Sequence, residues 1–563
     1  MEKAKAASIP TFEAGARAVE ETVRSGREEA FNADASDPLH HAFRAKAAVH
    51  SGPGGMPMIG EDARNELARL ADTPRTGTTL AYIHVPFCET RCLYCMFYQN
   101  PFHKEDSAAY ARMLEKELAL WGGKAAQDSA PIQALYFGGG TPTALEPDDI
   151  RSIMRAVQKY LPLANDCEIT FEGRIHNFTD EKMEAALEGG INRFSLGVQT
   201  FNTKVRQSVM RVDDRETLIR RLEKLASFNN ASVVMDLIYG FPGQTMEVWE
   251  DDLRTAASLP LDGIDCYQLN VFEKSPMARY IANGKLPPAA DAAQKADMFA
   301  RSVEFFTGEN WKRLSNNHWG RTPRERNIYN TFGKSACDCL AFGCGAGGRL
   351  SGYSFMQERM LKTWEELVEK GEKPAAFLMA PKPNWALLRT ISAAIESGSF
   401  NLSSIGREFG NLPLEQTVGK LLSQWQGAGL LEKRGDWYYE TVAGQYWSVT
   451  LAQFLIDYLE PHLSGTAAAQ GDKMFEGDPE KMKTISKAHP SGSAKGSAQR
   501  QMPASVMKML ETMPKAMIIE MAEHMPKEAL QRMLGNAPKE VLLRVLGEEG
   551  VKTLESADHA VDS

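Results

Sequence analysis

The chain has 563 residues, of which 43% are hydrophobic and 24% charged, and its formal net charge is −9. This length predicts more than one globular domain, and an acidic chain without a basic stripe does not fit a general nucleic-acid-binding protein. No apolar run approaches the roughly 20 residues that cross a bilayer. Because residues 1–25 show no signal-peptide pattern, we expect the eight cysteines to be reduced and the protein to be cytoplasmic.

Residues 78–310 carry the pattern of a parallel sheet built from βα units, after an N-terminal extension over residues 1–77. Six strands are predicted, over residues 81–86, 134–137, 168–171, 193–198, 232–238 and 263–271. Helices are predicted between them, over residues 107–121, 148–160, 180–187, 216–228 and 246–257. The fold class is therefore α/β, with a partial (β/α)6 barrel whose chemistry gathers at the carboxyl ends of the strands.

Three cysteines, Cys88, Cys92 and Cys95, follow the first predicted strand, and no fourth cysteine lies nearby. A closed zinc site or a fully ligated iron–sulfur cluster uses four protein donors. Three thiolates at this spacing therefore favour a [4Fe-4S] cluster with one iron open to a small molecule. The spacing CxxxCxxC is the signature of radical S-adenosylmethionine (SAM) enzymes. A zinc site and three unrelated buried thiols remain the alternatives.

The part of the chain after the barrel changes character twice. Residues 311–372 are irregular and rich in Gly, Asn, Arg and Cys, which predicts loops that close one side of the barrel. Residues 373–463 predict a winged-helix-like domain, with two or three helices followed by a hairpin around Gly435. Its mixed charges favour a packing or substrate-covering role over DNA binding.

The C-terminal hundred residues predict a linker and a small helical tail. Residues 464–502 consist mainly of small and polar side chains, which predicts disorder. Residues 503–556 repeat a proline followed by apolar residues at helical spacing, which predicts short helices begun by proline. Methionine is over-used in this tail, and a Met-rich core of a tiny bundle is favoured over a ligand site.

Four further motifs, in the same order, resemble the family that contains oxygen-independent coproporphyrinogen oxidase and its haem-handling relatives. They are residues 82–88 (YIHVPFC), 138–143 (GGGTPT), 192–199 (NRFSLGVQ) and 236–245 (DLIYGFPGQT). The resemblance extends through the winged-helix-like region. It implies a radical SAM barrel that binds a [4Fe-4S] cluster and SAM.

The resemblance also implies which residues line the SAM site. They are Tyr82, Gly139, Gly140, Thr141, Glu172, Gln199, Arg211 and Asp236. Glycines let the backbone approach a charged ligand closely. Glu172 and Gln199 suit the hydroxyls of a ribose, and Arg211 offers a guanidinium to the SAM carboxylate.

Departures from the coproporphyrinogen oxidase pattern indicate which branch of the family the chain resembles most. That enzyme type carries another cysteine just past the triad, whereas Cys95 is followed here by Met96. The haem chaperone branch carries a His-Asn-x-x-Tyr-Trp motif, which residues 324–330 (RERNIYN) lack. The chain is more similar to the anaerobic haem-degrading branch, the anaerobilin synthases, in the following stretches: residues 37–46, 49–52, 171–176 and 322–327.

The resemblance to this branch implies a reaction and its partners. SAM is cleaved reductively, a methyl-derived carbon is delivered to haem, and the macrocycle opens without oxygen to release iron and a methylated linear tetrapyrrole. Haem is then the substrate, and a flavodoxin- or ferredoxin-type protein supplies electrons. Haem trafficking and porphyrinogen decarboxylation are the alternatives. The protein's own tasks are orientation and exclusion of water.

A haem pocket needs cationic donors for two propionates beside apolar walls. Arg174, Arg324 and Arg326 are the propionate candidates. His176 and His318 are candidates for iron ligation or proton donation, although a lone histidine is more often structural. A second group, Cys337, Cys339 and Cys344, matches no common zinc or ferredoxin spacing and predicts small core residues or a redox-sensitive loop.

Overall fold

The computed structural model describes residues 29–58, 60–273 and 275–463. Contacts divide the chain into two units, Met1–Lys473 and Met474–Ser563, and every described residue belongs to the first. The predicted linker over residues 464–502 and the Met-rich tail over residues 503–556 lie outside the described residues. No helix in the described ranges is long and apolar enough to span a bilayer.

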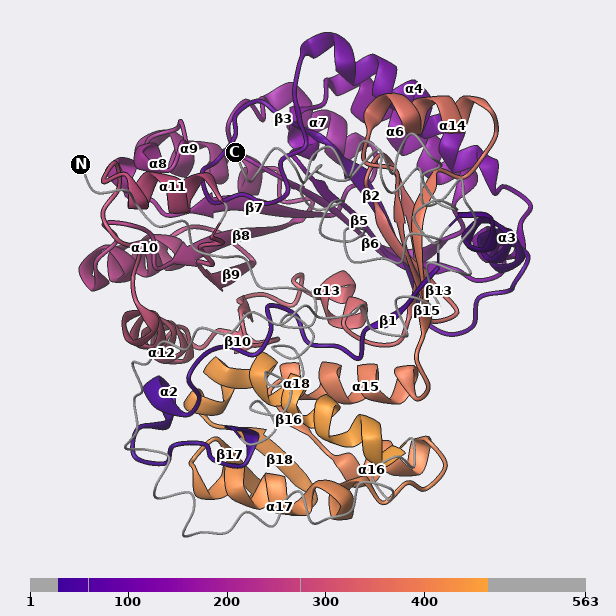
Figure 1. Ribbon diagram of the computed structural model, residues 1–563. Coiled ribbons are helices and arrows are strands. Elements are labelled where there is room, and N and C mark those ends of the chain that lie inside the picture. Colours follow the sequence, from indigo (N-terminus) through magenta and orange to yellow (C-terminus); the bar gives the residue numbers. More distant parts are fainter. Residues whose placement is uncertain (1–28, 59, 274, 464–563) are drawn as a thin grey trace, which may run out of the picture. The chain divides into compact units, whose positions relative to one another are not determined.

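Six parallel strands form the centre of a mixed sheet, in the spatial order β2-β5-β6-β7-β8-β9 (Figure 1). Their bounds are β2 (Thr79–Val85), β5 (Ile132–Gly139), β6 (Leu163–Gly173), β7 (Arg193–Gln199), β8 (Ser232–Tyr239) and β9 (Gly263–Gln268). Each of the six predicted strands is confirmed. Sequential strands are spatial neighbours because a helix crosses over between most of them.

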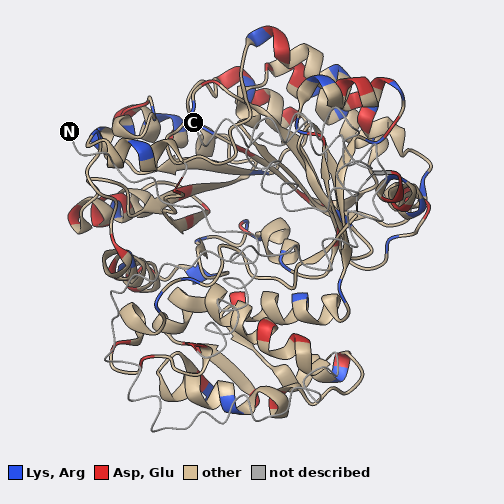
Figure 2. Ribbon diagram, in the orientation of Figure 1, with Lys and Arg blue, Asp and Glu red and all other residues tan. Residues whose placement is uncertain are grey.

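The predicted crossover helices are also present, and α4, α6 and α7 lie along the outer face of the sheet (Figure 1). Their bounds are α4 (Lys104–Leu120), α6 (Pro147–Tyr160), α7 (Asp180–Glu188), α9 (Arg215–Ser227) and α10 (Met246–Ser258). Thr179, Asp214 and Thr245 cap the amino ends of α7, α9 and α10, each accepting from a backbone N–H three residues on. Figure 2 shows acidic and basic residues interspersed along these outer helices.

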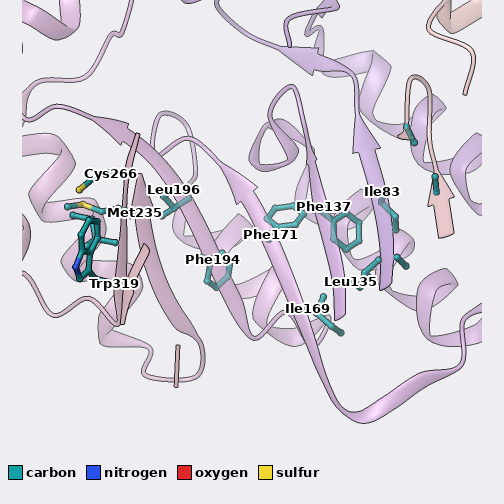
Figure 3. Close-up of a cluster of buried hydrophobic side chains, with 14 of the residues drawn as sticks. Ile83, Leu135, Phe137, Ile169, Phe171, Phe194, Leu196, Met235, Cys266 and Trp319 are labelled. Carbon is teal, nitrogen blue, oxygen red and sulfur yellow. The ribbon is translucent and has the colours of Figure 1, made fainter. Parts of the chain in front are cut away.

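The two faces of the central strands differ in polarity. Outward-facing residues such as Ile83, Phe137, Phe171 and Leu196 form the buried core under the helices (Figure 3). Because side chains alternate along a strand, the intervening residues, among them Tyr82, face the opposite side. This second face is unusually polar for the interior of a protein, and it carries the candidate site.

Residues 311–372 are more regular than the sequence indicates, so the prediction of irregular loops was wrong. They form β10 (Lys312–Arg313), β11 (His318–Gly320), α13 (Ile328–Gly333), β12 (Asp338–Phe342), β13 (Gly347–Leu350), β14 (Tyr353–Gln357) and α14 (Leu361–Glu369). β12 pairs parallel with β2 as a seventh parallel strand. β13 and β14 extend the sheet beyond it, and β11 pairs antiparallel with β9 at the other side.

The C-terminal part of the described chain follows the predicted order of helices and a hairpin. It comprises β15 (Ala375–Pro381), α15 (Trp385–Glu396), β16 (Ser399–Phe400), α16 (Leu402–Glu408), α17 (Leu414–Gly427), β17 (Leu431–Arg434), β18 (Trp437–Glu440) and α18 (Val442–Leu463). β17 and β18 pair antiparallel across a two-residue turn at Gly435 and Asp436. Gly435 has a φ of 61°, which favours glycine.

The N-terminal segment contacts both the C-terminal helices and the main sheet. α2 (Pro38–His41) packs on α18, where the Trp447 indole donates to the Pro38 carbonyl at 2.9 Å. β1 (Gly55–Met58) then adds antiparallel to β15, and α3 (Gly60–Ala71) follows it. Residues 55–58 of the predicted N-terminal extension are therefore part of the main sheet.

Candidate functional site

The three clustered cysteines lie in the loop that leaves the carboxyl end of β2. Cys88 ends the short strand β3 (Phe87–Cys88), which pairs with β4 (Asn100–Pro101). Cys88 and Cys92 are buried, Cys95 is partly exposed, and all three thiols are free. The backbone N–H of Cys95 donates to the Cys92 carbonyl at 3.3 Å, so the loop turns tightly between them.

Each thiol meets a polar donor, and for Cys95 the donor is the backbone N–H of Phe97, at 3.4 Å. The Thr141 hydroxyl donates to Cys88 Sγ at 3.3 Å, and Arg211 Nη1 lies 3.8 Å from Cys92 Sγ. Arg174 Nη1 donates to the hydroxyl of Thr90, inside the loop, at 2.8 Å. Two cations therefore border the thiols.

The charge environment differs between the thiols. Burial raises the pKa of Cys88 to about 11. Burial acts in the same direction on Cys92, but Arg211 and Arg174 outweigh it and lower the pKa of that thiol. The arginines therefore favour the thiolate form that iron binds, and their charge offsets that of an anionic cluster.

A [4Fe-4S] cluster fits this donor set. Such a cluster binds each cysteine at a different iron, so its ligands need not converge on one point. Among the residues the structure describes, no group of three or more His, Cys, Asp or Glu side chains converges as ligands of a single ion. Three thiols on one loop, with two adjoining guanidiniums, match a cluster that leaves one iron for a small molecule.

The predicted glycine run ends β5 and packs against the cysteine loop. Gly139 has a φ of 105°, a conformation that side chains rarely adopt, and a Cβ there would lie 2.6 Å from the His84 ring. A Cβ at Gly140 would collide with the Phe87 carbonyl. The glycines therefore allow the loop to sit directly on the strand end.

Next to the loop, several buried polar atoms have no partner within the described chain. They are Nε of Arg174, Nε of Arg211 and Oε1 of Gln199. A Cβ at Gly197 would lie 2.6 Å from Gln199 Nε2 and 3.1 Å from Arg211 Nη2, so these side chains converge over a glycine. Buried unpaired polar atoms are costly, and a bound ligand with a carboxylate and hydroxyls would pair them.

Two acidic residues face the same interior from adjacent parts of the sheet. Burial, and then the nearby charge of Asp236, raises the pKa of Glu172 to about 8. Burial and Asp265 raise the pKa of Asp236 to about 7. At neutral pH the Glu172 carboxyl is therefore largely protonated, and it can both donate and accept a hydrogen bond.

The structure adds interior residues that the sequence did not single out. Tyr136, Ser195, Asp265 and Tyr267 lie on the inward face of β5, β7 and β9, and Tyr329 lies on α13. The rings of Tyr136 and Tyr329 stack with centroids 4.6 Å apart, and Tyr82 stacks on Tyr136 at 6.4 Å. The sequence held a signal for the residues on these strands, because each strand was predicted and side chains alternate between its two faces. Taking Tyr82 and Asp236 as inward-facing would have identified them.

His318 belongs to a buried ion-pair network, which corrects its assignment to haem. Its Nε2 lies 3.0 Å from Glu325 Oε1 and its Nδ1 lies 2.8 Å from Asp265 Oδ2. Glu325 also accepts from Arg193 Nη2 at 3.0 Å. Burial opposes protonation, yet the two carboxylates raise the pKa of His318 to about 9. Both ring nitrogens of His318 therefore lie against carboxylates of the chain, which leaves neither nitrogen open to a haem iron.

Arg324 and Arg326 lie at the opposite end of the strands from the cysteine loop, so the structure also corrects their assignment. Arg324 Nε donates to Asp262, the residue before β9, at 3.1 Å. Arg326 pairs with Asp166, near the start of β6, at 3.4 Å, and both side chains are exposed. The buried carboxylate of Asp262 holds Arg324, and the exposed carboxylate of Asp166 holds Arg326.

The remaining candidates from the sequence sit near the cysteine loop or in the core. His176 Nδ1 lies 2.8 Å from Asp213 Oδ1, and its Nε2 lies 3.8 Å from Glu89, which follows Cys88. Like Arg174, it borders the loop. The second cysteine group, Cys337, Cys339 and Cys344, is free and buried in and around β12.

Comparisons with known proteins agree with this geometry. The profile of the Radical SAM superfamily matches residues 82–256. The chain is 38% identical to an anaerobilin synthase of Escherichia coli O157:H7, over 74% of this chain and 93% of that protein. It is 28% identical to the heme chaperone HemW of Bacillus subtilis, over 52% of this chain and 76% of that protein.

A solved structure shares the fold. The chain is similar to coproporphyrinogen III oxidase from Escherichia coli, a radical SAM enzyme, with a TM-score of 0.61 and 22% sequence identity. The match covers 73% of this chain and 96% of that one.

Proposed function

The chain belongs to the Radical SAM superfamily and, within it, to the family of the anaerobilin synthase, and from this premise we propose that it opens the haem macrocycle without oxygen. The reaction is a radical SAM methyl transfer that releases iron and a methylated linear tetrapyrrole. The observation that carries the proposal is the three-thiol loop, set beside buried polar atoms without partners at the strand ends.

The residues of the chain have separate tasks in this reaction. Cys88, Cys92 and Cys95 bind the cluster, which when bound supplies one electron for the cleavage of SAM. Arg211 is proposed to bind the SAM carboxylate, and Gln199 to bind its nucleoside. The Arg211 side chain and the Oε1 atom of Gln199 are buried, so these contacts form out of water, where they are stronger.

The other proposed SAM-site residues shape the same interior. They are Tyr82, Gly139, Gly140, Thr141, Glu172 and Asp236. Thr141 touches Cys88 and the glycines seat the loop, so these residues position the cluster relative to SAM. With a pKa of about 8, Glu172 offers a protonated carboxyl to a ribose hydroxyl at neutral pH.

Electron supply and location complete the proposal. Cleavage of SAM needs a one-electron donor, and a flavodoxin- or ferredoxin-type protein is proposed for this role. A cytoplasmic location is proposed because all eight cysteines are free thiols, as expected in a reducing compartment.

The test is an anaerobic incubation of the cluster-loaded protein with SAM, a low-potential reductant and haem. We expect loss of the Soret band, release of iron and a new mass that corresponds to a methylated linear tetrapyrrole. Omission of SAM and the variant Cys95→Ser are the controls, and both should leave haem intact. Rapid SAM cleavage with unchanged haem would contradict the proposal.

A second candidate function is haem delivery without turnover. The similarity to heme chaperones at 28% identity favours it. Under this alternative the protein would transfer intact haem stoichiometrically to an acceptor, and the mass of the tetrapyrrole would not change.

A further inference from the structure

The strands beyond β12 present an apolar face that the mechanism above does not use. In the register of β13, β14 and β15, Met356 lies opposite both Gly347 and Phe377, and Ser354 lies opposite both Arg349 and Met379. These six residues share one face of the sheet and are called here the β13–β15 face. The residues between them, such as Phe355 and Leu378, point into the buried core.

Two adjoining pockets lie on the β13–β15 face. The larger, of about 280 Å³, is bounded by Met356, Phe377 and Met379 and, on the barrel side, by Tyr329. The smaller, of about 180 Å³, is bounded by Arg389 and by residues 52–55. Arg349, Ser354 and Met379 border both pockets, so the apolar part runs into the cationic part.

The smaller pocket places two guanidiniums together without an acidic partner. Arg349 donates to the carbonyl of Ser335 at 2.6 Å, and both Arg349 and Arg389 donate to the carbonyl of Gly333, at 3.2 and 3.0 Å. Within the described residues neither arginine forms an ion pair with a carboxylate, and Arg389 Nε is buried without a partner. An anion would satisfy both.

Burial and the like charge of Arg349 lower the pKa of Arg389 to about 10. Arg389 therefore stays charged at neutral pH, and its repulsion with Arg349 favours an anionic ligand between the two guanidiniums. Gly52, from the N-terminal segment that resembles the haem-degrading branch, lies against this pair, since a Cβ there would be 3.5 Å from Arg389 Nη1.

We propose that the tetrapyrrole lies with its macrocycle on the β13–β15 face and with its propionates at Arg349 and Arg389; the proposal rests on the proposed function. Haem is flat and apolar and carries two carboxylates, which matches an apolar pocket that ends in two cations. Thioethers such as those of Met356 and Met379 adapt to flat apolar ligands. Gly347 carries no side chain, so the ring approaches the strand closely.

The place of this site in the barrel suits the reaction. Tyr329 borders the larger pocket, and its ring lies 6.3 Å from the ring of Tyr82. Tyr82 in turn lies beside Glu172, because a Cβ at Gly138 would contact both side chains. The β13–β15 face is therefore separated from the proposed SAM site by one layer of tyrosines, and substrate and SAM share one interior.

The test measures binding of haem and of haem dimethyl ester, which lacks the propionate charges, to the cluster-loaded full chain. The wild-type protein should prefer haem over the ester by about tenfold or more, the contribution of a charge-assisted hydrogen bond. Arg389→Gln should bind haem about tenfold more weakly, bind the ester unchanged and so lose the preference. SAM cleavage without haem should stay at the wild-type rate.

Two further variants distinguish the effect of the charge of the pocket on binding from the effect of its shape. Gly347→Leu fills the floor of the larger pocket and should weaken binding of haem and of the ester alike. The control Arg254→Gln removes an exposed guanidinium on α10 and should change neither affinity.

The outcomes distinguish this site from the proposed function. A wild-type protein that neither binds nor converts haem overturns the proposed function. A wild-type protein that converts haem while Arg389→Gln and Gly347→Leu keep the full affinity and preference overturns the site alone. If one of the two variants does not fold, the other decides, because each acts on a different pocket.

Discussion

The two ends of the central strands differ in whether their buried charged side chains form ion pairs. At the amino ends, Arg193, Glu325 and His318 form ion pairs with one another or with Asp265, although His318 Nδ1 and Asp265 Oδ2, 2.8 Å apart, lack hydrogen-bond geometry. At the carboxyl ends, Arg174 and Arg211 form no ion pair with a carboxylate of the described residues, and their buried Nε atoms have no hydrogen-bond partner there. Both ends use the same residue types, so residue type alone does not mark the site.

The difference indicates which charges bind a ligand. A buried polar atom without a partner costs about 1 to 3 kcal/mol, and such atoms persist where binding completes them. A buried ion pair is complete without a ligand, and its removal affects folding instead. Variants at the carboxyl ends should therefore change binding and spare stability, and variants at the amino ends should do the reverse.

Loss of one cluster thiol should have the largest effect. Cys92→Ser removes one of three iron ligands, so the reconstituted protein should contain no reducible four-iron centre, and SAM cleavage should fall to background. The melting temperature of the cluster-free protein should match that of cluster-free wild type. Iron and sulfide content and product assays check this, with Cys167→Ala, at a buried thiol in β6, as the control. A Cys92→Ser variant that keeps the cluster would show that the carboxyl ends do not hold it, and the two ends would then not differ in function.

Breaking the network at the amino ends should cost the most stability. Glu325→Gln leaves Arg193 and His318 buried with less compensating charge, which should lower the free energy of unfolding by about 3 to 5 kcal/mol. Denaturant unfolding of the cluster-free protein measures this. Glu432→Gln, in an exposed pair with Arg434, should stay within about 0.5 kcal/mol of wild type. A small loss at Glu325 would show that the network is not structural.

The same network should make stability depend on pH. The pKa of His318 rises from 6.5 to about 9 in the folded chain because Asp265 and Glu325 outweigh burial. Its contribution is fully present below about pH 6.5 and is lost as pH rises through about 9. The shift corresponds to on the order of 3 kcal/mol. Melting curves of wild type and His318→Gln should converge between pH 7 and about pH 10, and parallel curves would argue against a protonated His318.

A variant at the unpaired carboxyl end should act on SAM and not on folding. Gln199→Ala removes the buried Oε1 that has no partner, so SAM binding should weaken by about tenfold while the melting temperature stays unchanged or rises slightly. Equilibrium binding of SAM to the cluster-loaded protein measures the change. Gln158→Ala, at an exposed amide that donates to Gly189, is the matched control. Unchanged SAM affinity at Gln199 would mean that unpaired atoms do not mark the site.

The sequence predicted the parts of the fold whose signals are local. The strand before Cys88, the helices between the strands and the turn at Gly435 each depend on residues close together in the chain, and the structure confirms them. β12 and β13 were missed because neither shows an alternation of apolar and polar residues, and all five residues of β12 are buried. Glycines 347 and 348 open β13 without any side chain.

The candidate site was predicted where one loop carries its chemistry and was misassigned where pairing is long-range. Arg193 and Glu325 lie 132 positions apart, so no local pattern shows that the carboxylate between Arg324 and Arg326 turns inward. The same limit hid Arg349 and Arg389, since only the folded sheet brings them beside residues 52–55.

The smallest effect is expected at Arg326. This variant distinguishes a propionate site at Arg326 from one at Arg349 and Arg389. The sequence favoured Arg326 as a propionate ligand, whereas in the structure it pairs at 3.4 Å with an exposed Asp166. Arg326→Gln should therefore change the free energy of unfolding by less than about 0.5 kcal/mol and leave haem affinity at the wild-type value. Haem titration beside Arg389→Gln gives the direct comparison. Weaker haem binding in Arg326→Gln with normal binding in Arg389→Gln would move the propionates to the amino ends of the strands.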